Sequence, residues 1–80
     1  MVTKSQHAAA YRRLPGFLRL LREEAGLTQR GLRRRLRKPQ SYVYNCETGN
    51  RRVDVSEFVS WSSACGIEPV VTFERFVKSF

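Results

Sequence analysis

The sequence predicts an all-α fold, a compact domain of five helices. Apolar residues recur at the three- and four-residue spacing of a helix, most clearly in the series Leu14, Phe17, Leu18, Leu21 and Ala25. Prolines and glycines lie between such series, where helices usually begin and end. No stretch alternates apolar and polar residues as a half-buried strand does, and the chain has no internal repeat. The pattern therefore favours short helices packed around one core.

The first two helices are expected on either side of Gly26. Pro15 is expected to begin the first helix, because a proline in the first turn lacks only an N–H that has no helical partner there. Gly26 is expected to end this helix in the left-handed conformation. Thr28 is then expected to cap the second helix, whose inner face contains Leu32 and Leu36.

A third helix is expected from about Pro39 to Thr48, closed by Gly49. Val43 and Cys46 are apolar and form its inner face. Helical spacing then places a set of polar residues on the outer face: Ser41, Tyr44, Asn45 and Thr48.

Asp54, followed three residues later by Glu57, resembles the capping box that begins a helix, and it predicts a fourth helix that ends at Gly66. Pro69 is expected to begin a fifth. The expected buried faces are Val55, Phe58, Val59, Ser62 and Cys65 in the fourth helix, and Val70, Phe73, Val77 and Phe80 in the fifth. The aromatic residues Trp61, Phe73, Phe76 and Phe80 are expected in the core, with a dimer face as the alternative, because one short helix seldom hides so much apolar surface.

Length and composition are those of one small folded domain. The chain has 80 residues, of which 41% are hydrophobic, too many for a disordered chain. Residues 1–13 mix small and polar side chains and are expected to form a flexible leader, so the domain is expected to span residues 14–80. No apolar run is long enough to cross a bilayer, and the N-terminus lacks the apolar segment of a secretory signal. These features predict a cytoplasmic protein.

The sequence contains no catalytic or metal-binding pattern. His7 has no candidate partner, and neither a phosphate-binding loop motif nor a nucleophile–base spacing is present. Cys46 and Cys65 are too few for a disulfide scaffold or a metal cage. We therefore expect no enzyme activity, no metal ion and no cofactor.

The positive charge is concentrated in the middle of the chain. The stretch from Arg30 to Arg52 has eight basic residues and one acid, a net charge of +7 out of the +8 of the whole chain. A surface this basic suggests a partner rich in phosphate, because cations that neutralise phosphates release condensed counterions. An anionic membrane or an acidic protein would draw on the same charge. Charge alone therefore indicates an anionic partner and does not specify it further.

The stretch from Leu18 to Phe58 resembles the helix-turn-helix of Cro and the phage repressors, the XRE family. The most specific pieces are AGLTQ at residues 25–29, PQSYV at residues 39–43 and ETG at residues 47–49, in the family's order and spacing. With the flanking helices the resemblance covers about residues 14–77. It implies a lambda-repressor-like DNA-binding fold. It also implies a sequence-specific regulator of transcription, a repressor, that binds double-stranded DNA as a homodimer on a two-fold symmetric operator.

The resemblance also implies roles for individual residues. The third helix would enter the major groove of DNA, where amide and hydroxyl side chains hydrogen-bond to base edges. The candidate base contacts are Gln40, Ser41, Tyr44 and Asn45. The candidate contacts with the DNA backbone, which would set register and affinity, are Gln29, Arg30, Lys38, Thr48, Asn50, Arg51 and Arg52.

In some relatives, the positions of Arg22 and Glu47 form an ion pair between the first and third helices, and we expect the same pair here. Three residues depart from the family pattern. Arg33 replaces a small residue where the second and third helices cross, and Arg37 replaces a glycine in the turn. Gly31 replaces an acid that would complete a capping box, and it costs about 0.5–1 kcal/mol relative to alanine inside a helix.

Two other functions stay open at this level. One is the antitoxin of a toxin–antitoxin pair, which also binds its own promoter and whose partner would be a toxin or another small protein. The other is a protein-interaction module that keeps the fold without binding an operator. The departures at Arg33 and Arg37 bear on this choice, because they would alter the docking angle or lower the stability of the helix-turn-helix.

Overall fold

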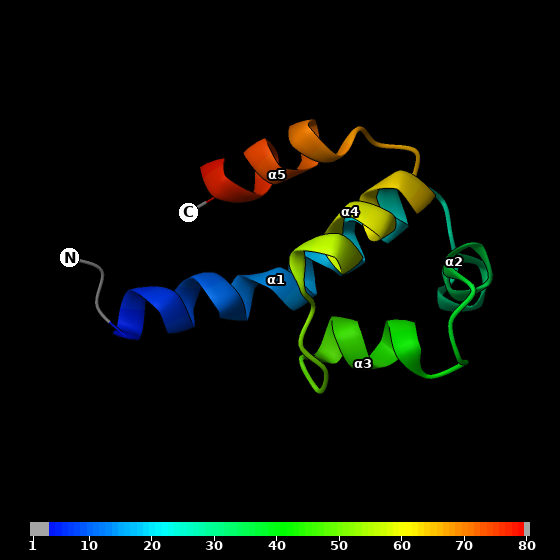
Figure 1. Ribbon diagram of the computed structural model, residues 1–80, viewed down its shortest axis with the longest axis horizontal. Coiled ribbons are helices and arrows are strands. Elements are labelled where there is room, and N and C mark those ends of the chain that lie inside the picture. Colours follow the sequence, from blue (N-terminus) through cyan, green and yellow to red (C-terminus); the bar gives the residue numbers. More distant parts are fainter. Residues whose placement is uncertain (1–3, 80) are drawn as a thin grey trace.

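The computed structural model describes residues 4–79, with the side chains of residues 11–79. It contains five helices, α1 (Lys4–Glu24), α2 (Gln29–Leu36), α3 (Tyr42–Thr48), α4 (Val55–Ala64) and α5 (Pro69–Lys78), and its described residues include no strand. The predicted all-α, five-helix fold is confirmed. In Figure 1, α1 and α4 lie in the middle of the molecule, α3 and α5 lie on opposite sides of them, and α2 closes one end.

The first helix begins much earlier than the sequence predicts. It starts at Lys4 instead of Pro15, which lies inside α1. Proline inside a helix removes one hydrogen bond, so the extension needs support from elsewhere. Tyr11 provides part of this support, since its hydroxyl accepts the backbone N–H of Val53 at 3.3 Å. Such a contact with a distant loop is not visible in the sequence. The division into a leader of residues 1–13 and a domain of residues 14–80 stays a prediction.

The second helix begins as predicted and ends with strain. The hydroxyl of Thr28 accepts the N–H of Gly31 at 2.9 Å, the expected N-cap. Leu32 is fully buried, and Leu36 packs on the same core. The helix ends at Arg37, whose φ of 56° and ψ of 46° are left-handed. A residue other than glycine adopts this conformation at a cost of about 1–2 kcal/mol. The backbone is therefore strained at Arg37, where the family usually has glycine.

The third helix is shorter than predicted. It runs from Tyr42 to Thr48, and Pro39 is outside it. The N–H of Tyr42 bonds to the carbonyl of Pro39 at 3.0 Å, which closes a tight turn before the helix begins. Gln40 and Ser41 therefore lie in a turn at the tip of α3 and not within the helix. Tyr42 points into the core, a contact that the sequence did not predict.

The predicted buried face of α4 is correct in part, because Phe58, Ser62 and Cys65 are buried as predicted. The capping box of Asp54 and Glu57 is present. Val55, however, is 81% exposed and Val59 is 42% exposed, so their predicted burial is wrong. Trp61 is fully buried, as predicted, and its indole N–H donates to the carbonyl of Leu18 at 3.1 Å. The large indole removes more apolar surface from water than a valine, so it sets the rotation of α4 about its axis.

The predicted apolar face of α5 is also wrong. Val70, Phe73 and Val77 are exposed, and Phe80 lies outside the described residues. Thr72 is fully buried instead, and its hydroxyl shares a hydrogen bond of 2.6 Å with the buried hydroxyl of Ser62 on α4. A buried hydroxyl needs a partner, so this pair fixes which side of α5 faces inward. The apolar residues on the other side are left in water.

α5 is also joined to α1. The guanidinium of Arg75 is 3.0 Å from both carboxylate oxygens of Glu24, and Arg13 donates to the carbonyl of Ser79. The buried apolar core then comprises Leu18, Leu21, Leu32, Tyr42, Val43, Cys46, Phe58, Trp61 and Cys65. Both cysteines are free thiols. All five helices contribute to this packing, through either the core or the contacts around it.

Replacing Arg37 by glycine should stabilise the protein. Glycine adopts the left-handed conformation without strain, so Arg37→Gly is expected to raise the free energy of unfolding by about 0.5–1 kcal/mol, after allowing for its more flexible unfolded chain. The control is Arg34→Gly, which removes the same charge from an exposed helical position and should lower stability by about 1 kcal/mol. Urea unfolding measures both. Equal losses in the two variants would show that the turn at Arg37 is not strained.

Candidate nucleic-acid interface

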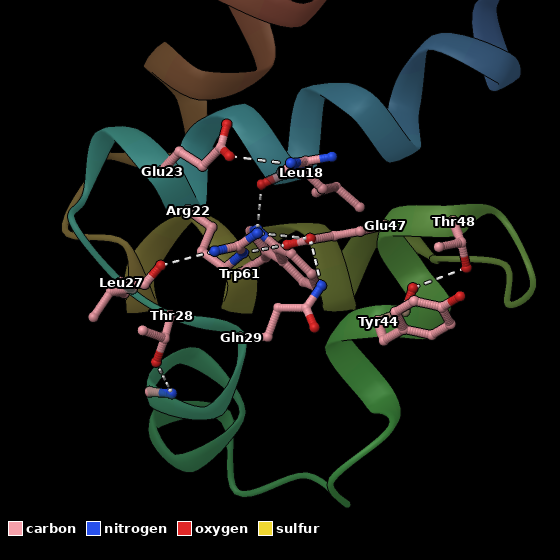
Figure 2. A network of polar contacts seen from close by, with 12 residues as sticks. Leu18, Arg22, Glu23, Leu27, Thr28, Gln29, Tyr44, Glu47, Thr48 and Trp61 are labelled. Atoms are coloured by element: carbon pink, nitrogen blue, oxygen red, sulfur yellow. Dashed lines mark hydrogen bonds and ion pairs between the residues drawn. The ribbon is translucent and has the colours of Figure 1, made fainter.

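An ion pair between α1 and α3 forms the centre of the site. Nε of Arg22 is 2.6 Å from Oε2 of Glu47, and Nη2 is 3.0 Å from Oε1. Nη1 of Arg22 donates to the carbonyl of Leu27 at 2.9 Å (Figure 2). The Glu47 side chain is only 2% exposed, so the predicted pair is shielded from water. The hydrogen bonds that Arg22 donates to the Glu47 carboxylate are the main cause of a raised pKa of Arg22.

Gln29 is the third member of this network. It is the first residue of α2, and its amide Nε2 donates to Oε1 of Glu47 at 3.1 Å (Figure 2). Glu47 therefore joins α3 to α1 through Arg22 and to α2 through Gln29. The sequence predicts Gln29 as a phosphate contact, and the structure places it at the N-terminus of α2, where backbone N–H groups attract anions. No local pattern in the sequence predicts the contact between Gln29 and Glu47, because the two residues lie far apart in the chain.

The candidate base contacts lie together at the tip and outer side of α3. Gln40, Ser41 and Tyr44 are exposed, and Asn45 is half-buried. Ser41 precedes the helix without a side-chain capping bond, so its hydroxyl is not used by the helix. Val43 and Cys46 are buried on the opposite side, as predicted. The helix thus presents uncharged hydrogen-bonding side chains to the exterior.

Two candidate backbone contacts lie at the far end of α3. The hydroxyl of Thr48 donates to the carbonyl of Tyr44 at 2.9 Å (Figure 2), so a contact with phosphate would have to replace that bond. Asn50 follows Gly49, which ends the helix with a φ of 81°, and it is exposed. The predicted closure of this helix by Gly49 is confirmed.

The basic residues around α2 do not all face solvent in the same way. Arg30 and Lys38 are exposed, and Nζ of Lys38 is 5.1 Å from the centroid of the Tyr42 ring. Arg35 donates to the carbonyl of Ala64 at 2.9 Å and so ties α2 to the end of α4. Arg33 is half-buried, and its Nε has no hydrogen-bond partner among the described residues. Part of the positive charge therefore supports the fold.

The two arginines that follow α3 have different surroundings. Nη1 of Arg51 is 2.7 Å from Oε2 of Glu57, an ion pair within the protein. The guanidinium of Arg52 lies 5.0 Å from the centroid of the Tyr11 ring, and no ion pair of Arg52 is found in the described part of the chain. The sequence treats both residues as equivalent backbone contacts, and the structure separates them.

In the described part of the chain, no group of three or more His, Cys, Asp or Glu side chains is arranged to hold a metal ion. None of the described helices is long and apolar enough to cross a membrane. The stretch that forms α2, α3 and the following loop is the most basic part of the chain, and it includes the uncharged outer side of α3.

The comparisons with known proteins agree with this geometry. A family model described as a helix-turn-helix domain matches residues 13–75. The chain belongs to the XRE-type helix-turn-helix family. The XRE-family like protein from Pseudomonas syringae pv. tomato str. DC3000 has a similar structure, with a TM-score of 0.86 and 36% sequence identity. The match covers 95% of this chain and 93% of that chain. No curated protein matches this chain. Helix-turn-helix proteins of this type are DNA-binding regulators, which gives the general function of this chain.

The sequence missed three residues that shape this interface. Tyr42 is buried at the start of α3, Glu57 pairs with Arg51, and Tyr11 contacts the loop after α3. Glu57 was recognised only as part of a capping box, and Tyr11 fell in the segment expected to be flexible. Their roles depend on contacts between residues far apart in the chain, for which one sequence carries no signal.

Removing Arg22 should destabilise the helix-turn-helix fold more than a surface change does. Arg22→Ala leaves the Glu47 carboxylate buried without its main partner, so unfolding should become easier by about 1–3 kcal/mol. Arg19→Ala is the control, since Arg19 pairs with Glu23 on the exposed side of the same helix and should cost less than about 0.5 kcal/mol. The double variant with Glu47→Ala should recover part of the loss. Strict additivity in this cycle would contradict a direct interaction.

Proposed function

We propose that this XRE-type helix-turn-helix protein is a repressor that binds a specific double-stranded DNA operator with α3 in the major groove. The observation that carries the proposal is an uncharged, hydrogen-bonding helix surface inside the most basic zone of the chain. A membrane or an acidic protein needs only the cations. Base edges in the major groove require donors and acceptors at fixed positions as well. A repressor bound there excludes other proteins from the same duplex.

Four residues are proposed to contact bases: Gln40, Ser41, Tyr44 and Asn45. Gln40 lies in the turn before α3 and would reach the groove first. The amide side chains of Gln40 and Asn45 match the paired donor and acceptor of adenine, and the Ser41 hydroxyl bonds to several bases. Tyr44 would contact a thymine methyl or a phosphate. The shielded Arg22–Glu47 pair supports this arrangement, because it holds α3 firmly enough to keep these side chains in register.

A second group is proposed to contact the DNA backbone: Gln29, Arg30, Lys38, Thr48, Asn50 and Arg52. These residues lie at the start of α2, in the turn before α3 and at or after the end of α3, so they border the base-reading residues on several sides. Contacts of this kind set the register of the protein on the duplex without carrying sequence information.

The protein is further proposed to act as a homodimer. Val70 is 73% exposed, and it borders a groove of about 290 Å³ between α4 and α5 that we call the α4–α5 groove. The groove is lined by Val55, Phe58, Val59, Pro69, Val70 and Phe73. Apolar side chains gathered in this way favour contact with another protein surface. We propose a second copy as the occupant, since two copies would place two α3 helices on the two halves of a symmetric operator. A toxin in the same groove is the alternative, and it would make the protein an antitoxin.

The base-reading residues should control specificity without affecting the fold. Selection from random duplex DNA would first yield the operator. Gln40→Ala and Asn45→Ala are then expected to weaken operator binding by about 1–3 kcal/mol each, while binding to a scrambled duplex at the same salt concentration changes little. Ser63→Ala, at an exposed position of α4, serves as the control and should bind both duplexes like the wild type. A wild-type protein without preference for any duplex would overturn the repressor proposal and favour the interaction module.

The α4–α5 groove should determine the oligomeric state. Val70→Glu places a charge at the edge of the groove, so the dimer is expected to dissociate while the helical content is retained. Val71→Glu is the matched control, because Val71 is also exposed but does not line the groove. Sedimentation equilibrium measures both variants. A wild-type protein that stays monomeric at all tested concentrations would contradict the homodimer, and a stable complex with a separate small protein would support the antitoxin.

A further inference from the structure

The loop between α3 and α4 contains an arginine that is already engaged. Nη1 of Arg51 is 2.7 Å from Oε2 of Glu57, and it also donates to the carbonyl of Arg52 at 2.8 Å. The guanidinium carbon lies 4.9 Å from the centroid of the Tyr42 ring. The backbone N–H of Arg51 donates to the carbonyl of Asn45 at 3.1 Å. A phosphate that bound this guanidinium would have to compete with Glu57.

Glu57 connects three parts of the chain. Its Oε1 accepts the backbone N–H of Asp54 at 2.9 Å, which closes the capping box of α4. Its Oε2 accepts the hydroxyl of Tyr42 at 3.2 Å and pairs with Arg51. The Glu57 side chain is 15% exposed. The pKa of Glu57 is lowered first by the N–H of Asp54 and then by the side chains of Arg51 and Tyr42, so the carboxylate stays charged.

This group, which we call the Tyr42–Arg51–Glu57 cluster, holds both ends of α3. Tyr42 is the first residue of α3 and is buried beside the turn that carries Gln40. At the other end, the backbone N–H of Arg51 donates to the carbonyl of Asn45, a proposed base contact, and the Arg51 side chain ties this backbone to Glu57. Because Glu57 belongs to α4, the cluster links the direction of α3 to a helix that contains none of the candidate base contacts. α3 has only seven residues, so its direction must come from such contacts.

We propose that Arg51 is a positioning residue for sequence reading, which acts through Glu57 and Tyr42, and that Arg52 is the phosphate contact of this loop. Arg52 is exposed and lies over the ring of Tyr11, an uncharged partner that leaves its charge available to DNA. The inference rests on the proposed operator binding. The sequence predicts the same role for both arginines, and this inference gives them two different roles.

The two roles differ in how they respond to salt and to sequence. Binding of each variant to the selected operator and to a scrambled duplex would be titrated over a range of salt concentrations. Arg52→Ala should weaken both complexes equally and lower the log–log salt slope by about one unit. Arg51→Ala should leave the slope on the scrambled duplex unchanged and reduce the preference for the operator about tenfold, the effect of misplacing one base contact. Lys78→Ala, on α5, controls for the loss of one charge.

Glu57→Gln provides the decisive comparison. Glutamine still completes the capping box, so α4 should remain folded. The variant also makes the protein more positive, which by charge alone would strengthen binding to every duplex. We expect a reduced operator preference instead, and a double variant with Arg51→Ala that is no worse than either single variant. Arg51→Lys should retain the slope and only part of the preference, because lysine lacks the planar guanidinium.

Three results would overturn the inference. If Arg51→Ala matched Arg52→Ala in both salt slope and operator preference, Arg51 would be a direct phosphate contact. Full recovery of preference in Arg51→Lys would likewise show that charge alone matters at this position. Stronger binding of Glu57→Gln to both duplexes, with the preference intact, would show that Glu57 does not position α3. A wild-type protein without sequence preference would instead remove the proposed operator binding itself, an outcome distinct from all three.

Discussion

The shielded contact between Arg22 and Glu47 is the interaction on which the arrangement of the helix-turn-helix depends. A nearly buried carboxylate is costly unless its oxygens are paired, so Glu47 is stable only where Arg22 and Gln29 can reach it. That requirement brings α1, the N-terminus of α2 and the end of α3 to fixed relative positions. α3 has only seven residues and would not be a stable helix alone. Its orientation is therefore a property of the network and not of its own sequence.

The contacts of the core also determine which faces of α4 and α5 are buried. The indole N–H of the fully buried Trp61 bonds to the carbonyl of Leu18, and the buried hydroxyls of Thr72 and Ser62 are hydrogen-bonded to each other. These directional contacts decide which faces of α4 and α5 turn inward. Valine and phenylalanine side chains have no polar group that must be hydrogen-bonded, so several of them remain exposed, as at Val55. The protein thus has a polar surface on α3 and a separate apolar surface between α4 and α5.

The charge of the central stretch also has two physical uses. Some cations are exposed and free to meet an anionic partner, as at Arg30. Others are bound to groups of the protein itself, as at Arg35 on the carbonyl of Ala64 and Arg51 on Glu57. Net charge indicates how strongly the surface attracts phosphate, but it does not distinguish these two groups. The distinction matters for mechanism, because a held cation acts by fixing geometry while an exposed one acts by releasing counterions.

The sequence by itself determined the features that depend on near neighbours. The N-caps at Thr28 and Asp54, the helix end at Gly49 and the family motif are all local, and the structure agrees with them. Only the tertiary structure decided where α1 begins, which faces of α4 and α5 are buried, and which side chains surround Arg51. Each of these depends on contacts between distant segments, where packing volume and hydrogen-bond partners outweigh local preference. Apolar spacing marks a helix reliably, but the rotation of that helix against its neighbours is set by the largest side chain and the polar groups that must be paired.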